Sequence, residues 1–181
     1  MWKKEKVFTI PNLLSVIRIA LIPWIIKLYC VDAAYTKALL VLILSGITDV
    51  ADGIIARKCN MISDLGKILD PVADKLTQMA TLLCLLTRFP HMWIPLGLLT
   101  VKELFTGILG LLAIRKTGQV IGADWHGKVC TVLLYAVMGV HMLWSSIPMG
   151  LSHGLVWLCM GVMVLSGVLY GCRNVKQLST G

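Results

Sequence analysis

The sequence predicts an all-α, polytopic membrane protein with six transmembrane helices and a short N-terminal amphipathic segment. The 181 residues are 57% hydrophobic and 14% charged, with a mean hydropathy of +0.83. An ordinary soluble domain has about 25% charged residues. The chain also divides into six apolar stretches of about 20 residues, the length that a helix needs to cross a bilayer. Because the connections are short, residues 1–181 are expected to form one membrane domain.

Turn and charge signals delimit these stretches. Residues 1–10 mix apolar residues with lysines, as expected for a segment that lies in the headgroup layer. Pro11 suits the first turn of a helix. Later breaks near residues 88–90, 115–118 and 148–150 contain proline, glycine or basic residues. The expected spans cover residues 12–30, 35–57, 66–87, 92–114, 125–146 and 151–172.

The net charge of +8 comes from basic residues scattered at the ends of the predicted spans. No single basic face is formed, which argues against nucleic-acid binding. Six alternating spans place most of them on one side of the membrane: Lys3, Lys4, Lys6, Arg57, Lys58, Lys67, Arg115, Lys116, Lys128, Arg173 and Lys176. The other side receives chiefly Lys37 and Arg88. By the positive-inside rule, both termini face the cytoplasm, and we expect a bacterial inner (plasma) membrane.

Aspartates at the ends of the second and third predicted spans are the best indication of function. Asp49 and Asp52 share one stripe of the second span, and Asp70 and Asp74 share a face of the third. A charged side chain inside a bilayer costs roughly 2.5–3.5 kcal/mol, so these carboxylates need a compensating cation or substrate, and a divalent metal ion is the natural candidate. Because the loop between the spans is short, we expect antiparallel neighbours whose acidic stripes converge on the cytoplasmic side.

Carboxylate oxygens suit hard cations such as Mg²⁺ or Mn²⁺, and the absence of His and Cys from this cluster argues against zinc. Two ions about 4 Å apart would bridge a diphosphate and offset its charge. Gly53, Ala56 and Gly66 lack bulk, so a ligand can approach the backbone closely. The alternative is that these small residues serve only helix packing.

The aspartates and the small residues fill every position of the pattern D-x2-D-G-x2-A-R-x8-G-x3-D-x3-D: Asp49, Asp52, Gly53, Ala56, Arg57, Gly66, Asp70 and Asp74. In this the chain resembles the CDP-alcohol phosphatidyltransferase family, and the six-span layout extends the resemblance along the whole chain. The resemblance implies transfer of a substituted phosphoryl group from a CDP-linked donor to an alcohol, with release of CMP. Such enzymes use two divalent ions and are commonly homodimers.

The resemblance also assigns roles to individual residues. It implies that Asp49, Asp52, Asp70 and Asp74 bind the metal ions and that Asp74 is also the catalytic base on the acceptor hydroxyl. The residues that border the CDP donor would be Asp52, Gly53, Ala56, Arg57, Gly66 and Asp70.

Residues 10–18, 70–75 and 125–131 are similar to the phosphatidylglycerophosphate synthases of this family, which join CDP-diacylglycerol to glycerol 3-phosphate. Two positions depart from that branch. Cys130 stands where a second basic residue is common, and Lys102 with Glu103 stands where an Arg-Glu pair is usual. Acceptors such as inositol phosphate, serine, or phosphatidylglycerol to make cardiolipin therefore stay open.

An anionic acceptor favours cations beside the metal pocket, and the candidates are Arg18, Lys75, Arg115 and Lys128. Asn12, Ser15 and Arg18 recur at three-residue steps, so they line one side of the first span. Alternatively, the side chain of Arg18 extends to the membrane surface, and Arg115 serves only to set the orientation of the chain in the membrane.

Glu103, near the middle of the fourth span, needs an interior partner. Because Lys102 is adjacent in sequence, we expect it to point elsewhere, which leaves Arg18, Lys128 or another helix as the partner of Glu103.

Two other classes of membrane protein also have acidic residues within their membrane-spanning helices. Intramembrane prenyltransferases use paired aspartate motifs with Mg²⁺, but on well-separated helices of longer chains. A cation channel or transporter would not explain why these acids crowd at one end of the predicted bundle.

Overall fold

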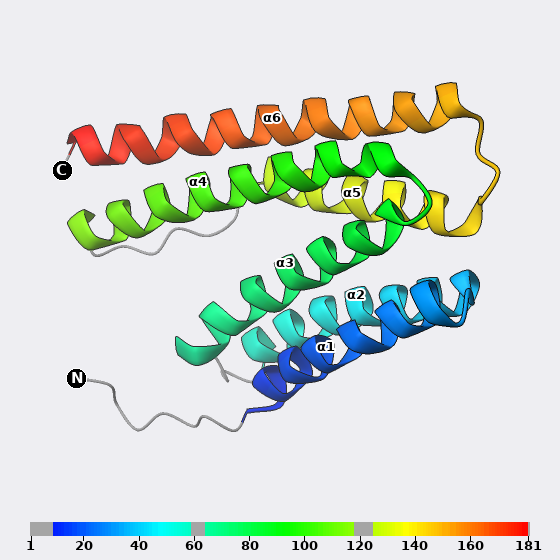
Figure 1. Ribbon diagram of the computed structural model, residues 1–181. Coiled ribbons are helices and arrows are strands. Elements are labelled where there is room, and N and C mark those ends of the chain that lie inside the picture. Colours follow the sequence, from blue (N-terminus) through cyan, green and yellow to red (C-terminus); the bar gives the residue numbers. More distant parts are fainter. Residues whose placement is uncertain (1–8, 59–63, 118–124, 181) are drawn as a thin grey trace. The chain divides into compact units, whose positions relative to one another are not determined.

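The computed structural model describes residues 9–58, 64–117 and 125–180, which are helical without a strand (Figure 1). Within these ranges, the side chains of residues 10, 52–58, 64, 65, 67, 68, 111, 113–117 and 176–180 are not described. The elements are α1 (Ile10–Ile26), the π-helical turn η1 (Lys27–Val31), α2 (Tyr35–Lys58), α3 (Asp64–Leu86), the 3-10 turn η2 (Pro90–Met92), α4 (Trp93–Thr117), α5 (Trp125–Leu143) and α6 (Met149–Thr180).

The expected span 12–30 covers α1 and the π-helical turn η1, and each of the other expected spans lies mainly on one helix. The bounds of α6 depart most, because it continues past residue 172 to Thr180. Within the described ranges, four segments are long and apolar enough to cross a membrane: Pro11–Val31, Pro90–Gly110, Trp125–Leu143 and Met149–Val175. They indicate an integral membrane protein. Among the described residues α2 and α3 do not meet this test, and these are the helices that carry the aspartates.

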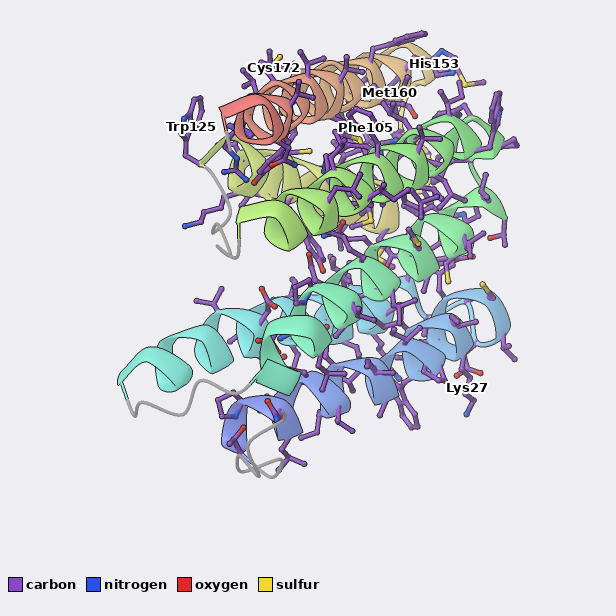
Figure 2. All side chains as sticks on the ribbon, turned by 90° about the vertical axis from the view of Figure 1, so that its left-hand side faces the viewer. Lys27, Phe105, Trp125, His153, Met160 and Cys172 are labelled. Carbon is purple, nitrogen blue, oxygen red and sulfur yellow. The ribbon has the colours of Figure 1, made fainter. Side chains whose placement is uncertain are left out.

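In these helices many exposed side chains are apolar and many buried side chains are polar, the reverse of a soluble protein. Large apolar side chains such as Leu40, Ile47, Val101, Val132 and Leu158 are exposed, and Figure 2 shows such carbon-rich side chains projecting from the helices. The buried side chains include many polar ones: Asn12, Ser15, Arg18, Ser45, Thr77, Gln78, Thr81, His141, Ser152, Ser166 and Asn174. This arrangement suits a lipid environment outside and hydrogen bonding inside.

The chain forms two compact units, residues Met1–Arg88 and Phe89–Gly181. In the first unit, α1 packs against both α2 and α3, whereas α2 and α3 make few direct contacts in the part that the structure describes. In the described part of the chain α1 therefore supplies most of the packing in this unit, and Asp49 on α2 lies within electrostatic range of Asp70 and Asp74 on α3. Apolar residues such as Ile25, Leu42 and Leu85 form the core of this unit.

The connection from α1 to α2 is a tight reversal. The amide of Asp32 donates to the carbonyl of Lys27 at 3.0 Å, and the amide of Ala34 donates to that of Leu28 at 2.8 Å. Ala33 has a φ of 48°, in the left-handed region that a non-glycine residue seldom adopts. The guanidinium of Arg88, which ends this unit, lies 4.2 Å from the ring centroid of Tyr35, so the start of α2 and the end of α3 are held together.

In the second unit α6 packs against both α4 and α5. Close approach of α4 and α6 depends on glycine, because a Cβ atom on Gly171 would lie 3.1 Å from Cε1 of Phe105. The Nζ atom of Lys102 is 2.5 Å from Oε1 of Glu103, so the expectation that Lys102 points away from its neighbour was wrong. The flexible lysine stem lets the ammonium fold back onto the adjacent carboxylate.

Candidate active site

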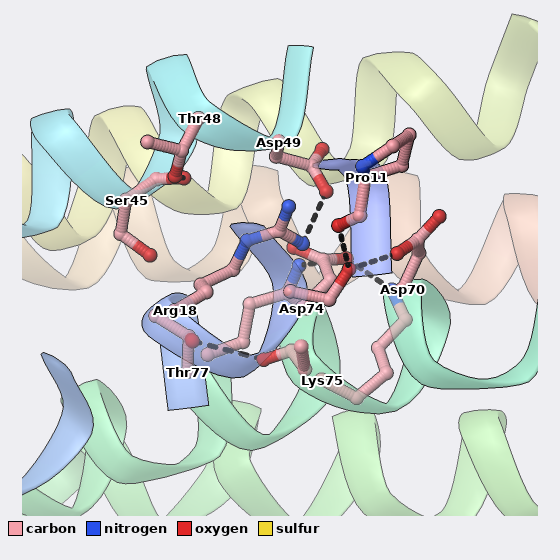
Figure 3. Close-up of polar contacts among 12 residues, drawn as sticks. Pro11, Arg18, Ser45, Thr48, Asp49, Asp70, Asp74, Lys75 and Thr77 are labelled. Carbon is pink, nitrogen blue, oxygen red and sulfur yellow. Dashed lines mark hydrogen bonds and ion pairs between the residues drawn. The ribbon is translucent and has the colours of Figure 1, made fainter. Parts of the chain in front are cut away.

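The predicted site residues of the first unit come from all three of its helices (Figure 3). Asp49 is on α2, Asp70 and Asp74 are on α3, and Arg18 is on α1. Thr9 and Pro11 start α1 at this end: the amide of Asn12 donates to Oγ1 of Thr9 at 3.4 Å, and Pro11 occupies the first turn. These local signals fix where α1 begins beside the aspartates.

Asp49 is paired with the guanidinium of Arg18. Nη1 of Arg18 donates to Oδ1 of Asp49, across 31 positions of sequence. The Arg18 side chain is 1% exposed, whereas that of Asp49 is 43% exposed. The aspartate therefore lies at the rim of the site, and the arginine lies beneath it between the helices.

Asp70 and Asp74 each accept a hydrogen bond from a buried neutral side chain. Oγ of Ser15 on α1 donates to Oδ1 of Asp70. Nε2 of Gln78, one turn after Asp74 on α3, donates to Oδ2 of Asp74 at 2.9 Å. Nζ of Lys75 lies 3.3 Å from the same Oδ2 atom. The orientation of Asp74 is thus fixed by an amide and an ammonium.

A polar layer continues inward from the aspartates. Ser45 and Gln78 are buried, and Oγ of Ser45 and Oε1 of Gln78 have no hydrogen-bond partner in the described part of the chain. The hydroxyls of Thr77 and Thr81 donate to carbonyls one turn back, those of Ala73 at 2.9 Å and Thr77 at 2.8 Å. Sequence reasoning missed Gln78, although its position four residues after Asp74 continues the stripe of Asp70 and Asp74.

Several predicted site residues are placed only in part. The side chains of Asp52, Gly53, Ala56 and Arg57 lie outside the described residues, although the α2 backbone continues through them. Gly66 is buried on α3. The other two acceptor candidates belong to the second unit: Arg115 has no described side chain, and Lys128 is exposed near the start of α5.

The donor set fits a hard divalent cation by its chemistry. Asp70 and Asp74 lie within electrostatic range of Asp49, and no His or Cys belongs to the cluster. Among the described residues no three His, Cys, Asp or Glu side chains are arranged as a complete metal site. The pattern supplies a fourth carboxylate, that of Asp52, from the part whose side chains are not described.

Residues 8–166 match the family model described as CDP-alcohol phosphatidyltransferase. The chain is 30% identical to a CDP-diacylglycerol--glycerol-3-phosphate 3-phosphatidyltransferase of Bacillus subtilis (strain 168), over 96% of this chain and 98% of that protein. It is 29% identical to a protein of the same name from Rickettsia bellii, over 89% and 92%. It is 40% identical to a cardiolipin synthase (CMP-forming) of Streptomyces coelicolor, over 73% of this chain and 64% of that protein.

Proposed function

This chain belongs to the CDP-alcohol phosphatidyltransferase family, and we propose that it transfers the phosphatidyl group of CDP-diacylglycerol to glycerol 3-phosphate, forming phosphatidylglycerophosphate and CMP. The observation that carries this choice of acceptor is the similarity to the Bacillus subtilis enzyme over 98% of that protein. Cardiolipin synthesis from phosphatidylglycerol is the second candidate, because the Streptomyces coelicolor relative is more identical, at 40%. The chain covers only 64% of that relative, which favours the first candidate.

Asp49, Asp52, Asp70 and Asp74 would bind two divalent ions, Mg²⁺ or Mn²⁺, which when bound offset the charge of the donor's diphosphate. The residues that border this donor would be Asp52, Gly53, Ala56, Arg57, Gly66 and Asp70. Small residues at three of these positions leave room for the cytidine diphosphate beside the helix backbones.

In the reaction, a hydroxyl oxygen of glycerol 3-phosphate attacks the phosphorus of the phosphatidyl group while the bond from that phosphorus to the CMP oxygen breaks. Asp74 accepts the proton of the attacking hydroxyl as general base. The contacts of Gln78 and Lys75 with Oδ2 at 2.9 Å and 3.3 Å support this role, because they hold the carboxylate in one orientation. Positioning of the two substrates supplies much of the remaining catalysis.

For the phosphate of the acceptor we propose Arg18, Lys75, Arg115 and Lys128 as ligands. Lys75 is best supported, because its Nζ atom is already beside Asp74 and its side chain is 25% exposed. Arg18 would act through the guanidinium that pairs with Asp49, and so would place the acceptor next to the metal-binding carboxylates.

We propose that all six helices cross a bacterial inner membrane, that residues 1–10 lie on its cytoplasmic surface, and that the active site and both termini face the cytoplasm. The distribution of Lys and Arg supports this orientation. We further propose a homodimer. Gly107 and Gly110, three residues apart on α4, support this proposal because small residues let two membrane helices approach each other closely.

The purified protein in detergent, supplied with CDP-diacylglycerol, Mg²⁺ and single alcohols, tests the proposal by release of CMP. Release with glycerol 3-phosphate alone is the expected result. Release only with phosphatidylglycerol would show the second candidate to be correct, and release with inositol phosphate or serine would reject both acceptors. Omission of Mg²⁺ and Mn²⁺ should abolish the reaction, and full activity with a chelator present would reject the metal requirement.

A further inference from the structure

The buried polar face of α1 is directed at the acidic residues of both neighbouring helices. Asn12, Ser15 and Arg18 are 4%, 0% and 1% exposed. The described part of α1 contains no carboxylate of its own, yet Arg18 donates to a carboxylate of α2 and Ser15 donates to a carboxylate of α3. A buried guanidinium is stable only when it is paired, so the position of Arg18 is tied to that of Asp49.

The two contacts determine the spacing of the aspartates. Arg18 fixes α1 against Asp49, and Ser15 fixes α1 against Asp70, 55 positions away in sequence. In the described part of the chain α2 and α3 make few direct contacts, whereas α1 packs along both. The separation of Asp49 and Asp70 is therefore set through α1.

The hydroxyl of Ser15 has one proton and two acceptors within reach. One is Oδ1 of Asp70, and the other is the carbonyl oxygen of Pro11 at 3.1 Å, one turn back on α1. A carboxylate is the stronger acceptor, so the proton is directed at Asp70. A hydrogen bond to one oxygen of a metal-binding carboxylate holds its remaining lone pairs in a fixed direction.

We propose that Ser15 is a positioning residue that orients Asp70 for binding a divalent cation. Metal affinity then depends on α1, a helix whose described part supplies no metal ligand. This inference rests on the proposed function in one respect, namely that the aspartates bind a divalent ion. It does not depend on which alcohol is the acceptor.

The test measures Mn²⁺ binding to the full chain in detergent, without substrates. The amount bound is determined from the decrease in the electron paramagnetic resonance signal of free Mn²⁺. Ser15→Ala is expected to weaken Mn²⁺ binding about tenfold, in the range found for residues that support metal ligands. Ser45→Ala is the matched control. Ser45 is also 0% exposed and lies one turn before Asp49, but its hydroxyl has no hydrogen-bond partner among the described residues. Its substitution should leave Mn²⁺ affinity unchanged.

Combining Ser15→Ala with Asp70→Asn tests whether Ser15 acts through Asp70. In an Asp70→Asn background, Ser15→Ala should cause no further loss of Mn²⁺ affinity. An equal additional loss in that background would overturn the inference, and so would wild-type affinity in Ser15→Ala alone. Wild-type protein that binds no Mn²⁺ would overturn both this inference and the proposed metal site. CMP release with an unexpected alcohol would change the proposed function alone.

Discussion

At the scale of single residues, Asp74 is the side chain on which the proposed chemistry depends most. Its Oδ2 atom accepts from Gln78 and lies next to the ammonium of Lys75. Asp74→Asn keeps the shape of the side chain but cannot take up the proton of an acceptor hydroxyl. We expect CMP release to fall by about 100-fold or more while CDP-diacylglycerol still binds. CMP assays and donor titrations measure the two effects, and near-normal turnover would exclude Asp74 as the base.

Gln78 offers a way to separate activity from stability. Gln78→Met removes a hydrogen bond to Asp74, but it also removes Oε1, which is buried without a hydrogen-bond partner in the described structure. Since both effects are about 1–3 kcal/mol, they nearly cancel. We expect the free energy of unfolding to change by less than about 1 kcal/mol while kcat falls about tenfold.

Thr81→Val is the control for Gln78→Met, because among the residues that the structure describes the Thr81 hydroxyl donates to the carbonyl of Thr77 on the same helix and to no carboxylate. Its kcat should stay near the wild-type value. Wild-type kcat in Gln78→Met would show that Asp74 does not need its amide partner.

Arg18 and a bound metal ion offset the same negative charges, so each should partly replace the other. Arg18→Gln leaves Asp49 without its guanidinium. Without added metal we expect a lower unfolding temperature, since the carboxylates then repel one another. Adding Mn²⁺ should raise that temperature by more than it does in the wild type. Arg18→Lys keeps the charge and should respond to Mn²⁺ as the wild type does; equal responses in all three proteins would contradict the prediction.

At the scale of elements, the sequence could predict the helices but not all of their partners. Apolar stretches of span length, ended by proline, glycine and charge, placed six helices close to their observed bounds. The three-residue spacing of Asn12, Ser15 and Arg18 correctly predicted one polar side of α1, because periodicity reports which residues share a face. It does not report which helix meets that face. The position of α1 against both α2 and α3 therefore came only from the structure.

The same distinction applies to individual contacts. The fixed spacing of the aspartate pattern identified Asp49, Asp70 and Asp74 as candidates, whereas the contact between Lys102 and Glu103 contradicted a rule based on helix geometry alone. A long flexible side chain can reach a neighbour that its Cα–Cβ direction does not face. Gln78 was missed, although it continues the stripe of Asp70 and Asp74, because the sequence does not show that this glutamine is buried.

Packing of α4 on α6 can be tested with glycine substitutions. Gly171→Ala would place a Cβ atom 3.1 Å from the Phe105 ring, whereas a Cβ atom at Gly161 meets nothing within 4 Å in the described chain. Overpacking typically costs about 1–3 kcal/mol, so Gly171→Ala should unfold at a lower temperature than Gly161→Ala. Gly161→Ala is the matched control on the same helix and should be neutral or slightly stabilised. Equal unfolding temperatures for the two variants would contradict the close α4–α6 contact.

At the scale of the whole molecule, the question is whether α2 and α3 cross the membrane. Among the described residues, α2 and α3 are not in the set of segments that are long and apolar enough to cross a membrane. Six spans place the connection between α2 and α3 in the cytoplasm, whereas four spans without α2 and α3 place it outside. The turn between α5 and α6 lies outside in both cases.

Labelling of single cysteines in cells distinguishes the two topologies. A variant that keeps only Cys59, between α2 and α3, should react with a membrane-impermeant maleimide only after the cells are permeabilised. Ser145→Cys in a background without other cysteines should react in intact cells, because Ser145 is exposed in the turn after α5. Reaction of Cys59 in intact cells would show that α2 and α3 do not cross.

The pairing of Arg18 with Asp49 also has a consequence for biosynthesis. A ribosome makes α1 first, so the arginine reaches the translocation machinery 31 residues ahead of its counter-ion. A lone cation within a nascent span is unfavourable in lipid. The first helix therefore becomes fully compatible with the bilayer only when the second arrives, and the two are expected to leave the insertion channel together as a hairpin.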